Sequence, residues 1–211
     1  MKIKSVIFDI DGTLWDSRAL VAEGYNAQLR KEGYDRYFVT AEDLKPLFGK
    51  TMTEIADILF AELPVPDRYD LLDRCMASEN SHLHESECNI GYPGVKQTLE
   101  RLAEKYRLFI VSNSQSGYPQ LCMEKMGIGH LIEGHLCFGD TGTEKGQTIL
   151  TLMKQHQVTD AVYVGDTQGD YEATVVAGIP FIWAAFGFGN PQGFAARAEQ
   201  FADLPQILEE M

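Results

Sequence analysis

An apolar segment near the N-terminus runs straight into two aspartates, and this junction constrains the fold more than any other feature of the chain. Residues 3–8 are mostly apolar and are followed by Asp9, Ile10, Asp11 and Gly12. The pattern predicts a buried strand that ends in a polar turn. In parallel sheets, ligands bind at this carboxyl end of the strands. Two carboxylates so close repel each other unless a cation lies between them or one keeps its proton. Mg²⁺ shared with a phosphate meets this need, although a solvated acidic turn has the same sequence.

The same arrangement recurs in the second half of the chain. Residues 160–165 are mostly apolar and precede Asp166, with Asp170 four positions later. If a helix begins near Thr167, the two carboxylates share one face of it at the end of the strand. One would then bind Mg²⁺ directly, and the other through water or by orienting its neighbour. The alternative is that Asp170 merely caps the helix.

Three further polar side chains occupy a strand end and a helix start. The apolar residues 108–111 end at Ser112 and Asn113, whose hydroxyl and amide groups can bind phosphate oxygens, although Ser-Asn after a strand is often only a turn. Lys145 begins an amphipathic helix. A cation in a first helical turn opposes the helix dipole at a cost of about a few tenths of a kcal/mol. We therefore expect a compensating partner, such as a bound phosphate together with Asp9.

A long helical block separates the first strand from the second. Apolar residues recur at helical spacing over residues 15–90, with stop signals at Gly33 and Pro64. This stretch is too long for an ordinary crossover, so we predict an inserted all-helical cap over residues 15–90. Residues 1–14 and 91–211 alternate between helix and strand, which predicts an α/β core with a three-layer parallel sheet. Its later elements are expected as strands at 108–111, 136–138, 161–164 and 180–185, and helices at 117–126, 145–156 and 204–208.

Composition argues against several classes of partner. The 211 residues carry a net charge of −13 at pH 7, which disfavours nucleic acid and anionic membranes because both are bound by basic patches. A metal ion reconciles this charge with a phosphate ester. No apolar run approaches 18 residues, no signal peptide is evident, and the four scattered cysteines indicate reduced thiols. We expect a soluble, cytoplasmic protein, whose oligomeric state the sequence does not indicate.

Two nucleotide-binding motifs begin but are not completed. Gly49-Lys50-Thr51 resembles the end of a P-loop, but position 44 is Leu rather than Gly. Gly187-Phe188-Gly189 begins a G-x-G-x-x-G motif, but position 192 is Gln. Neither motif is predicted to bind a nucleotide. Trp15 and Tyr92, at the two connections between cap and core, are expected to pack there.

In chain order, the acidic pair, Ser112-Asn113, Lys145 and the second acidic pair resemble the four motifs of the haloacid dehalogenase-like hydrolases. The resemblance spans the whole chain, although relatives often have Pro where this chain has Gly146. It implies a Mg²⁺-dependent phosphatase acting on a small phosphorylated metabolite. Asp9 would be the nucleophile that forms an aspartyl phosphate, and Asp11 the general acid and then the general base. Dehalogenases lack this second aspartate, so Asp11 argues against dehalogenation. Four carboxylates would surround the metal, with that of Asp11 beside it rather than on it: Asp9, Asp11, Asp166 and Asp170.

The cap position, its helical make-up and the Gly-Tyr-Pro-Gly-Val return at residues 91–95 look most similar to the phosphoglycolate phosphatase-like subgroup. A sugar phosphomutase of the β-phosphoglucomutase type uses the same four motifs and is the alternative enzyme. A phospho-accepting receiver module, from a different class, is disfavoured by the long cap and by the motif order. We expect the cap to select the substrate, with Lys50 and free N–H groups at residues 49–51 facing an anion. A solvated surface lysine is the alternative for Lys50.

Overall fold

The computed structural model describes residues 3–211, and the chain divides into two compact units. The α/β unit consists of the residues up to Asp16 together with Ile90–Met211, and the helical unit consists of Ser17–Asn89. No helix in the described part of the chain is both long and apolar enough to cross a membrane. All four cysteines are free thiols.

The α/β unit is built on a six-stranded parallel sheet with the strand order β3-β2-β1-β4-β5-β6. The four inner strands, β2, β1, β4 and β5, are mainly apolar and buried, as sheets covered on both faces require. Because β1 pairs with both β2 and β4, the strand order reverses beside β1, and open α/β sheets bind ligands at such a point. The strand bounds are Ser5–Phe8 (β1), Arg107–Ser112 (β2), Gly134–Cys137 (β3), Ala161–Gly165 (β4), Phe181–Ala184 (β5) and Ala196–Ala198 (β6).

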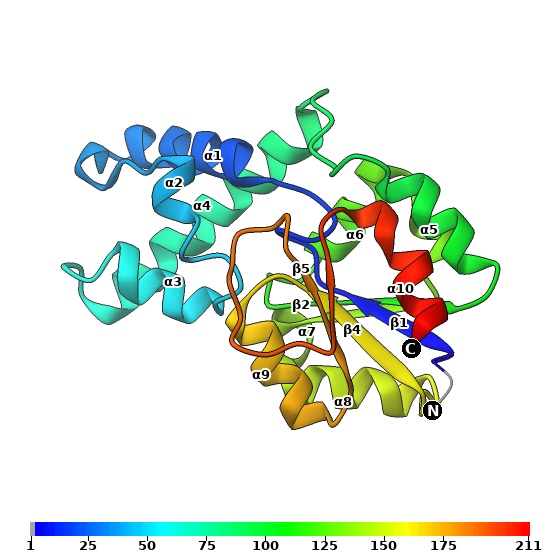
Figure 1. Ribbon diagram of the computed structural model, residues 1–211. Helices are drawn as coiled ribbons and strands as arrows, with labels where there is room; N and C mark the ends of the chain where they lie inside the picture. Colours follow the sequence, from blue (N-terminus) through cyan, green and yellow to red (C-terminus); the bar gives the residue numbers. More distant parts are fainter. Residues whose placement is uncertain (1–2) are drawn as a thin grey trace. The chain divides into compact units, whose positions relative to one another are not determined.

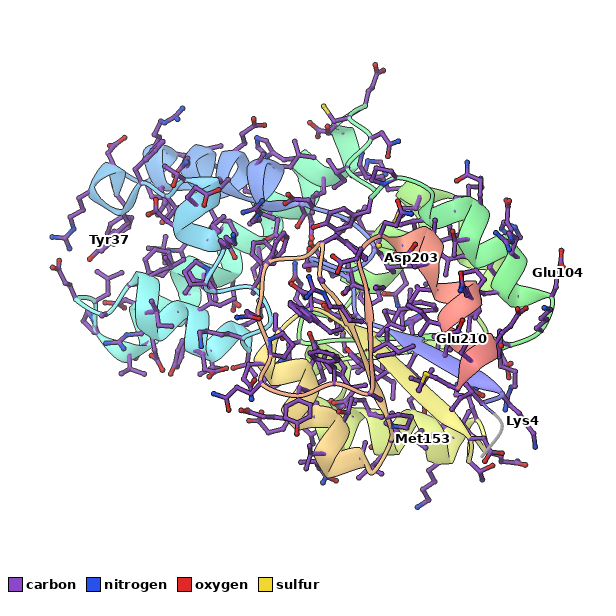
Figure 2. All side chains as sticks on the ribbon, viewed as in Figure 1. Lys4, Tyr37, Glu104, Met153, Asp203 and Glu210 are labelled. Carbon is purple, nitrogen blue, oxygen red and sulfur yellow. The ribbon has the colours of Figure 1, made fainter. Side chains whose placement is uncertain are left out.

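Helices cover both faces of this sheet. Figure 1 shows α8 and α9 on one face and α5 and α10 on the other, which makes three layers and confirms the predicted fold class. One hydrophobic core includes Phe109, Tyr163 and Phe181 of the strands with Ile149 and Leu152 of α8. The helix bounds are Val95–Ala103 (α5), Tyr118–Met126 (α6), Phe138–Thr141 (α7), Lys145–Gln155 (α8), Gln168–Ala177 (α9) and Leu204–Glu210 (α10). Acidic side chains such as Glu104 and Glu210 project outward, where water solvates their charge (Figure 2).

In the α/β unit, one short strand and one short α-helix were not predicted. β6 spans only Ala196–Ala198, and its Ala-Arg-Ala sequence has no apolar run to mark it. α7 is a four-residue helix, too short to show periodicity. The strand expected at 136–138 begins two residues earlier, at Gly134, and ends at Cys137.

The helical unit has its own hydrophobic core. It contains α1 (Arg18–Lys31), α2 (Ala41–Leu44), α3 (Met52–Leu59), α4 (Val65–Glu85) and a short 3₁₀ helix at Asp35–Tyr37. Tyr25 and Leu29 of α1 belong to the same buried cluster as Leu71 of α4. Gly24 lets these helices approach closely, because a Cβ there would lie 2.6 Å from the Cα of Glu79.

The two chain connections at the boundary of the α/β unit run side by side. Trp15 bridges to Asp11 on one side and to Gly91 on the other. The Asp16 N–H donates to the Ile90 carbonyl at 2.8 Å, and the Tyr92 N–H donates to the Leu14 carbonyl at 3.1 Å. The Tyr92 ring packs edge-on against Phe186 with 5.0 Å between ring centroids, as the expectation of packing at this position required.

Candidate active site

The candidate site lies where β1, β2 and β4 end at the same edge of the sheet. Asp9 follows β1, Asp166 follows β4, and Ser112 is the last residue of β2. The Asp9 N–H donates to the Val164 carbonyl at 2.9 Å, so pairing with β4 continues up to the first carboxylate. The strand order reverses at this edge, which is the position where ligands bind in open α/β sheets.

Lys145 joins the two acidic pairs. Its Nζ lies 2.8 Å from Asp9 Oδ1 and 2.6 Å from Asp170 Oδ1. All three side chains are at least nine-tenths buried. Two carboxylates thus supply the partner that a lysine in a first helical turn requires. The next residue, Gly146, has a packing role: a Cβ there would lie 2.8 Å from Val176 Cβ, so glycine lets α8 approach α9.

The ionisation of this cluster is set by burial and by Lys145. Burial raises the pKa of Asp9 to about 7, even though the charge of Lys145 acts to lower it. Burial also raises the pKa of Asp166 well above its ordinary value, with Asp170 and Asp9 adding to the effect. Burial opposes ionisation of Asp170 too, but the charge and hydrogen bond of Lys145 hold the pKa of Asp170 below the usual value. Burial acts to lower the pKa of Lys145, but Asp170 and Asp9 hold it above the ordinary lysine value.

Asp170 both caps α9 and binds Lys145, so the two interpretations offered for it hold together. Its Oδ2 accepts hydrogen bonds from the Thr167 N–H at 2.9 Å, the Thr167 hydroxyl at 2.7 Å and the Asp166 N–H at 3.2 Å. Thr167 is the N-cap of α9, and it forms a reciprocal capping box with Asp170. Protein donors therefore already engage both oxygens of this carboxylate.

The glycine-rich loop after β5 fixes the carboxylate of Asp166. Oδ2 of Asp166 accepts the N–H of Phe188 at 2.6 Å and that of Gly189 at 3.3 Å. A Cβ on Gly187 would lie 2.3 Å from the Gly12 carbonyl oxygen and 2.4 Å from Asp166 Cβ, so only glycine fits. Gly12 itself has a φ of +84° and leaves no room for a Cβ beside Asp166. The segment dismissed as a failed nucleotide motif is thus part of the site.

The surroundings of the other carboxylate oxygen of Asp166, Oδ1, indicate a cation site. Oδ1 is buried and has no hydrogen-bond partner among residues 3–211, an arrangement that is costly for a carboxylate in a protein interior. Oxygens of Asp9, Asp166 and Asp170 lie within 4.8 Å of one another. If all three carboxyl groups are ionised, one lysine leaves excess negative charge, and oxygen ligands are those that Mg²⁺ prefers. The residues present therefore fit a divalent ion.

Asp11 has different surroundings from these three carboxylates. Its side chain is not part of the three-carboxylate group. Instead, Asp11 Oδ1 accepts a hydrogen bond from Trp15 Nε1 at 2.8 Å and another from the Tyr118 hydroxyl at 2.9 Å. Trp15 was expected only to pack, and Tyr118 was not predicted as a site residue. The contact between Tyr118 and Asp11 brings together positions 107 residues apart, which no local pattern indicates.

The segment after β2 carries the predicted phosphate-binding residues. Ser112 is buried, and its Oγ accepts the Ser114 N–H at 3.2 Å. Ser112 therefore also forms a local turn, which was the alternative to phosphate binding. Asn113 is half-buried in the same turn. Two buried hydroxyls that the sequence analysis missed, those of Ser114 and Thr13, have no hydrogen-bond partner within the described residues. Both follow strands at this edge of the sheet, which is the signal that could have found them.

The segment around Lys50 differs from its prediction in one respect. The Lys50 N–H donates to the Leu47 carbonyl at 3.1 Å, and the Thr51 N–H donates to Glu54 Oε2 at 2.8 Å. Thr51 and Glu54 form a capping box at the start of α3. The expectation that residues 50 and 51 offer free N–H groups to an anion is therefore wrong, because the helix caps itself. The side chain of Lys50 is half-buried.

Comparisons with known proteins agree on one family. The sequence model of a family described as haloacid dehalogenase-like hydrolase matches residues 6–184. A phosphoglycolate phosphatase of Aliivibrio fischeri is 30% identical over 203 residues, covering 89% of this chain and 86% of that protein. One of Xanthomonas campestris pv. campestris is 27% identical over 215 residues, covering 98% and 95%. The crystal structure of a predicted phosphoglycolate phosphatase from Haemophilus somnus superposes with a TM-score of 0.83 at 23% identity, covering 98% of each chain.

Proposed function

Because the chain belongs to the haloacid dehalogenase-like hydrolases and is a phosphoglycolate phosphatase-like enzyme, we propose that it hydrolyses a small phosphorylated metabolite through an aspartyl phosphate on Asp9. The observation that carries this proposal is the buried contact of Lys145 with Asp9 at the edge of the sheet. The lysine neutralises the nucleophile and attracts a phosphate to the same point. Phosphoryl transfer depends mostly on such positioning and charge neutralisation.

The proposed reaction has two halves. In the first, Asp9 Oδ2 attacks phosphorus, the bond from phosphorus to the ester oxygen breaks, and Asp11 gives its proton to the leaving alcohol. In the second, water attacks the phosphorus of the aspartyl phosphate, Asp11 takes a proton from that water, and the bond from phosphorus to Asp9 breaks. Inorganic phosphate leaves, and both aspartates return to their starting state.

The phosphate oxygens would be held by hydroxyl and amide groups at the strand ends. Ser112 and Asn113 come from the segment after β2, and Lys145 supplies the positive charge. The buried hydroxyls of Thr13 and Ser114 are suited to the same task, because a bound phosphate would satisfy them.

The metal proposal follows from the carboxylates. Asp9 and Asp166 would hold Mg²⁺, with Asp170 orienting them and Asp11 beside the site. When bound, Mg²⁺ neutralises charge on the carboxylates and on phosphate oxygens. The support is Oδ1 of Asp166, which is buried and has no hydrogen-bond partner in the part of the chain that the structure describes.

We further propose that residues 15–90 form a cap that selects the substrate, and that residues 1–14 and 91–211 carry the chemistry. The polar groups named above would contact only phosphate and metal, so discrimination between substrates would come from other side chains, such as Lys50. We also propose a cytoplasmic location, since all four cysteines are free thiols.

A screen of small phosphomonoesters tests this function. Phosphoglycolate is included because relatives carry its name, and each reaction is run with Mg²⁺ and again with EDTA. We expect phosphate release over many turnovers, loss of activity in EDTA, and loss of several orders of magnitude in rate for Asp9→Asn. Near-normal release by Asp9→Asn would refute the assignment of the nucleophile. An isomerised sugar phosphate without phosphate release would indicate a phosphomutase, and a single phosphorylation without turnover would indicate a receiver module.

A further inference from the structure

We propose that Tyr118 and Trp15 are positioning residues for Asp11, and that they direct its proton transfer to one oxygen, Oδ2. This inference rests on the proposed function, in which Asp11 is the general acid and base. It assigns a role to two residues that the four sequence motifs do not contain.

Both side chains converge on the same atom. Trp15 Nε1 and the Tyr118 hydroxyl each donate to Asp11 Oδ1, at 2.8 Å and 2.9 Å. Trp15 is 0% exposed and Tyr118 is 2% exposed. Their rings meet edge-on, with 5.6 Å between centroids and an interplanar angle of 79°. Each ring therefore limits the movement of the other.

The main chain holds both donors in place. The carbonyl of Trp15 accepts the Gly12 N–H at 2.9 Å, and its own N–H donates to the Ile10 carbonyl at 3.3 Å. Tyr118 is the first residue of α6, and its helix starts after Gly117, which has a φ of +87°. Glycine adopts this left-handed conformation readily, so the chain turns there and α6 begins with its tyrosine buried at Asp11.

Two donors on one oxygen decide where the proton resides. A carboxylate oxygen has two lone-pair positions, and the indole N–H and the phenol O–H occupy those of Oδ1. A proton on Oδ1 would have to displace one of these donors. The proton given to the leaving alcohol, and later taken from water, is therefore carried by Oδ2. With Oδ1 fixed at two points, the direction of Oδ2 is also fixed, and proton transfer depends on such alignment.

The test is the variant Tyr118→Phe, which removes one hydroxyl and keeps the ring. Two esters are compared through kcat/KM, which reports the first half-reaction: an alkyl phosphate, whose leaving alkoxide needs a proton, and p-nitrophenyl phosphate, whose leaving group needs little help. We expect kcat/KM for the alkyl ester to fall roughly tenfold, as loss of one hydrogen bond to a carboxylate implies. For the nitrophenyl ester we expect a change of less than roughly twofold.

Two controls separate positioning from folding. Tyr106→Phe makes the same change elsewhere in the α/β unit and should alter neither ester. In an Asp11→Asn background, Tyr118→Phe should have no further effect, because the group it positions is gone. Equal losses on both esters, or a full loss in the Asp11→Asn background, would refute the positioning role while leaving the phosphatase assignment intact. A wild-type protein that releases phosphate from no ester would refute the proposed function, and this inference with it.

Discussion

Removing divalent cations should make the stability of this protein depend steeply on pH. With EDTA present, Lys145 is the cation in contact with the buried Asp9, and Asp9 shares it with Asp170. Burial raises the pKa of Asp9 from 3.8 to about 7. In this pH range the folded state therefore binds a proton that the unfolded state has lost. The free energy of unfolding therefore falls as pH rises from about 4 to about 7 and then levels off.

The size of this effect follows from the shift. Between the unfolded and folded pKa values of Asp9, each pH unit lowers the free energy of unfolding by about 1.4 kcal/mol. The step from pH 5 to pH 7 therefore lowers it by about 3 kcal/mol. For a chain of this size that lowers the melting temperature by roughly 6–12 °C. Mg²⁺ at one hundred times its dissociation constant should restore about 3 kcal/mol. Asp166, whose pKa burial also raises, acts in the same direction, whereas burial lowers the pKa of His135, which acts in the opposite one.

Thermal unfolding followed by circular dichroism at pH 5, 6, 7 and 8, in EDTA and in millimolar Mg²⁺, measures this dependence. The variant Asp9→Asn isolates the contribution of one carboxyl, because Asp166 and His135 remain in it. Its melting temperature in EDTA should fall less between pH 5 and 7 than that of the wild type. Asp73→Asn, on the exposed surface of α4, should keep the wild-type slope. If the melting temperatures of the wild type and of Asp9→Asn change in parallel with pH, then burial does not raise the pKa of Asp9, and this prediction is refuted.

Four further predictions concern single side chains. Asp166→Asn should abolish most of the Mg²⁺-induced rise in melting temperature, and an unchanged rise would place the ion elsewhere. Gly187→Ala should weaken Mg²⁺ binding measured by calorimetry roughly tenfold or more, as loss of a supporting contact does at metal sites, whereas Gly129→Ala, where a Cβ has room, should not. Asp11→Asn should accumulate phosphoenzyme from p-nitrophenyl phosphate, detectable by intact-protein mass spectrometry, since this leaving group needs little help from an acid while the group that activates water is lost; an unmodified variant after incubation with this ester would contradict the prediction. Lys50→Ala should raise KM for the best substrate and leave p-nitrophenyl phosphate unaffected, and equal effects on both would exclude it from substrate selection.

The parts of the site that could be predicted from sequence are those with a local signal. Asp9 and Asp166 each follow an apolar strand, and Lys145 stands where a cation is unfavourable without a partner. These signals lie within a few residues of the side chain they indicate. The α/β class follows in the same way, from strands and helices long enough to show periodicity.

The remaining parts depend on contacts between distant segments. Tyr118 meets Asp11 only because α6 begins at this edge of the sheet, and nothing in the sequence near either residue indicates it. The loop at residues 187–189 was compared with a nucleotide motif, whereas its glycines are required by the close approach of Gly12 and Asp166. At Asp170, the local sequence is compatible with helix capping and with a role in the site. It does not reveal that one oxygen of the carboxylate caps α9 while the other binds Lys145.

The paired connections at Asp16 and Ile90 have a consequence for how such a protein can change. Since the Asp16 N–H already bonds to the Ile90 carbonyl at 2.8 Å, the ends of the segment Ser17–Asn89 are held together by the sheet-bearing unit itself. Closing a loop between two fixed points costs conformational entropy, and this free-energy cost grows slowly, by about 0.6 kcal/mol for each doubling of the loop's length. The sheet therefore tolerates almost any segment at this junction at nearly the same cost. Insertion, deletion or replacement of the whole helical unit is thus open to evolution and to protein engineers, while the carboxylates and lysine of the sheet edge stay in register.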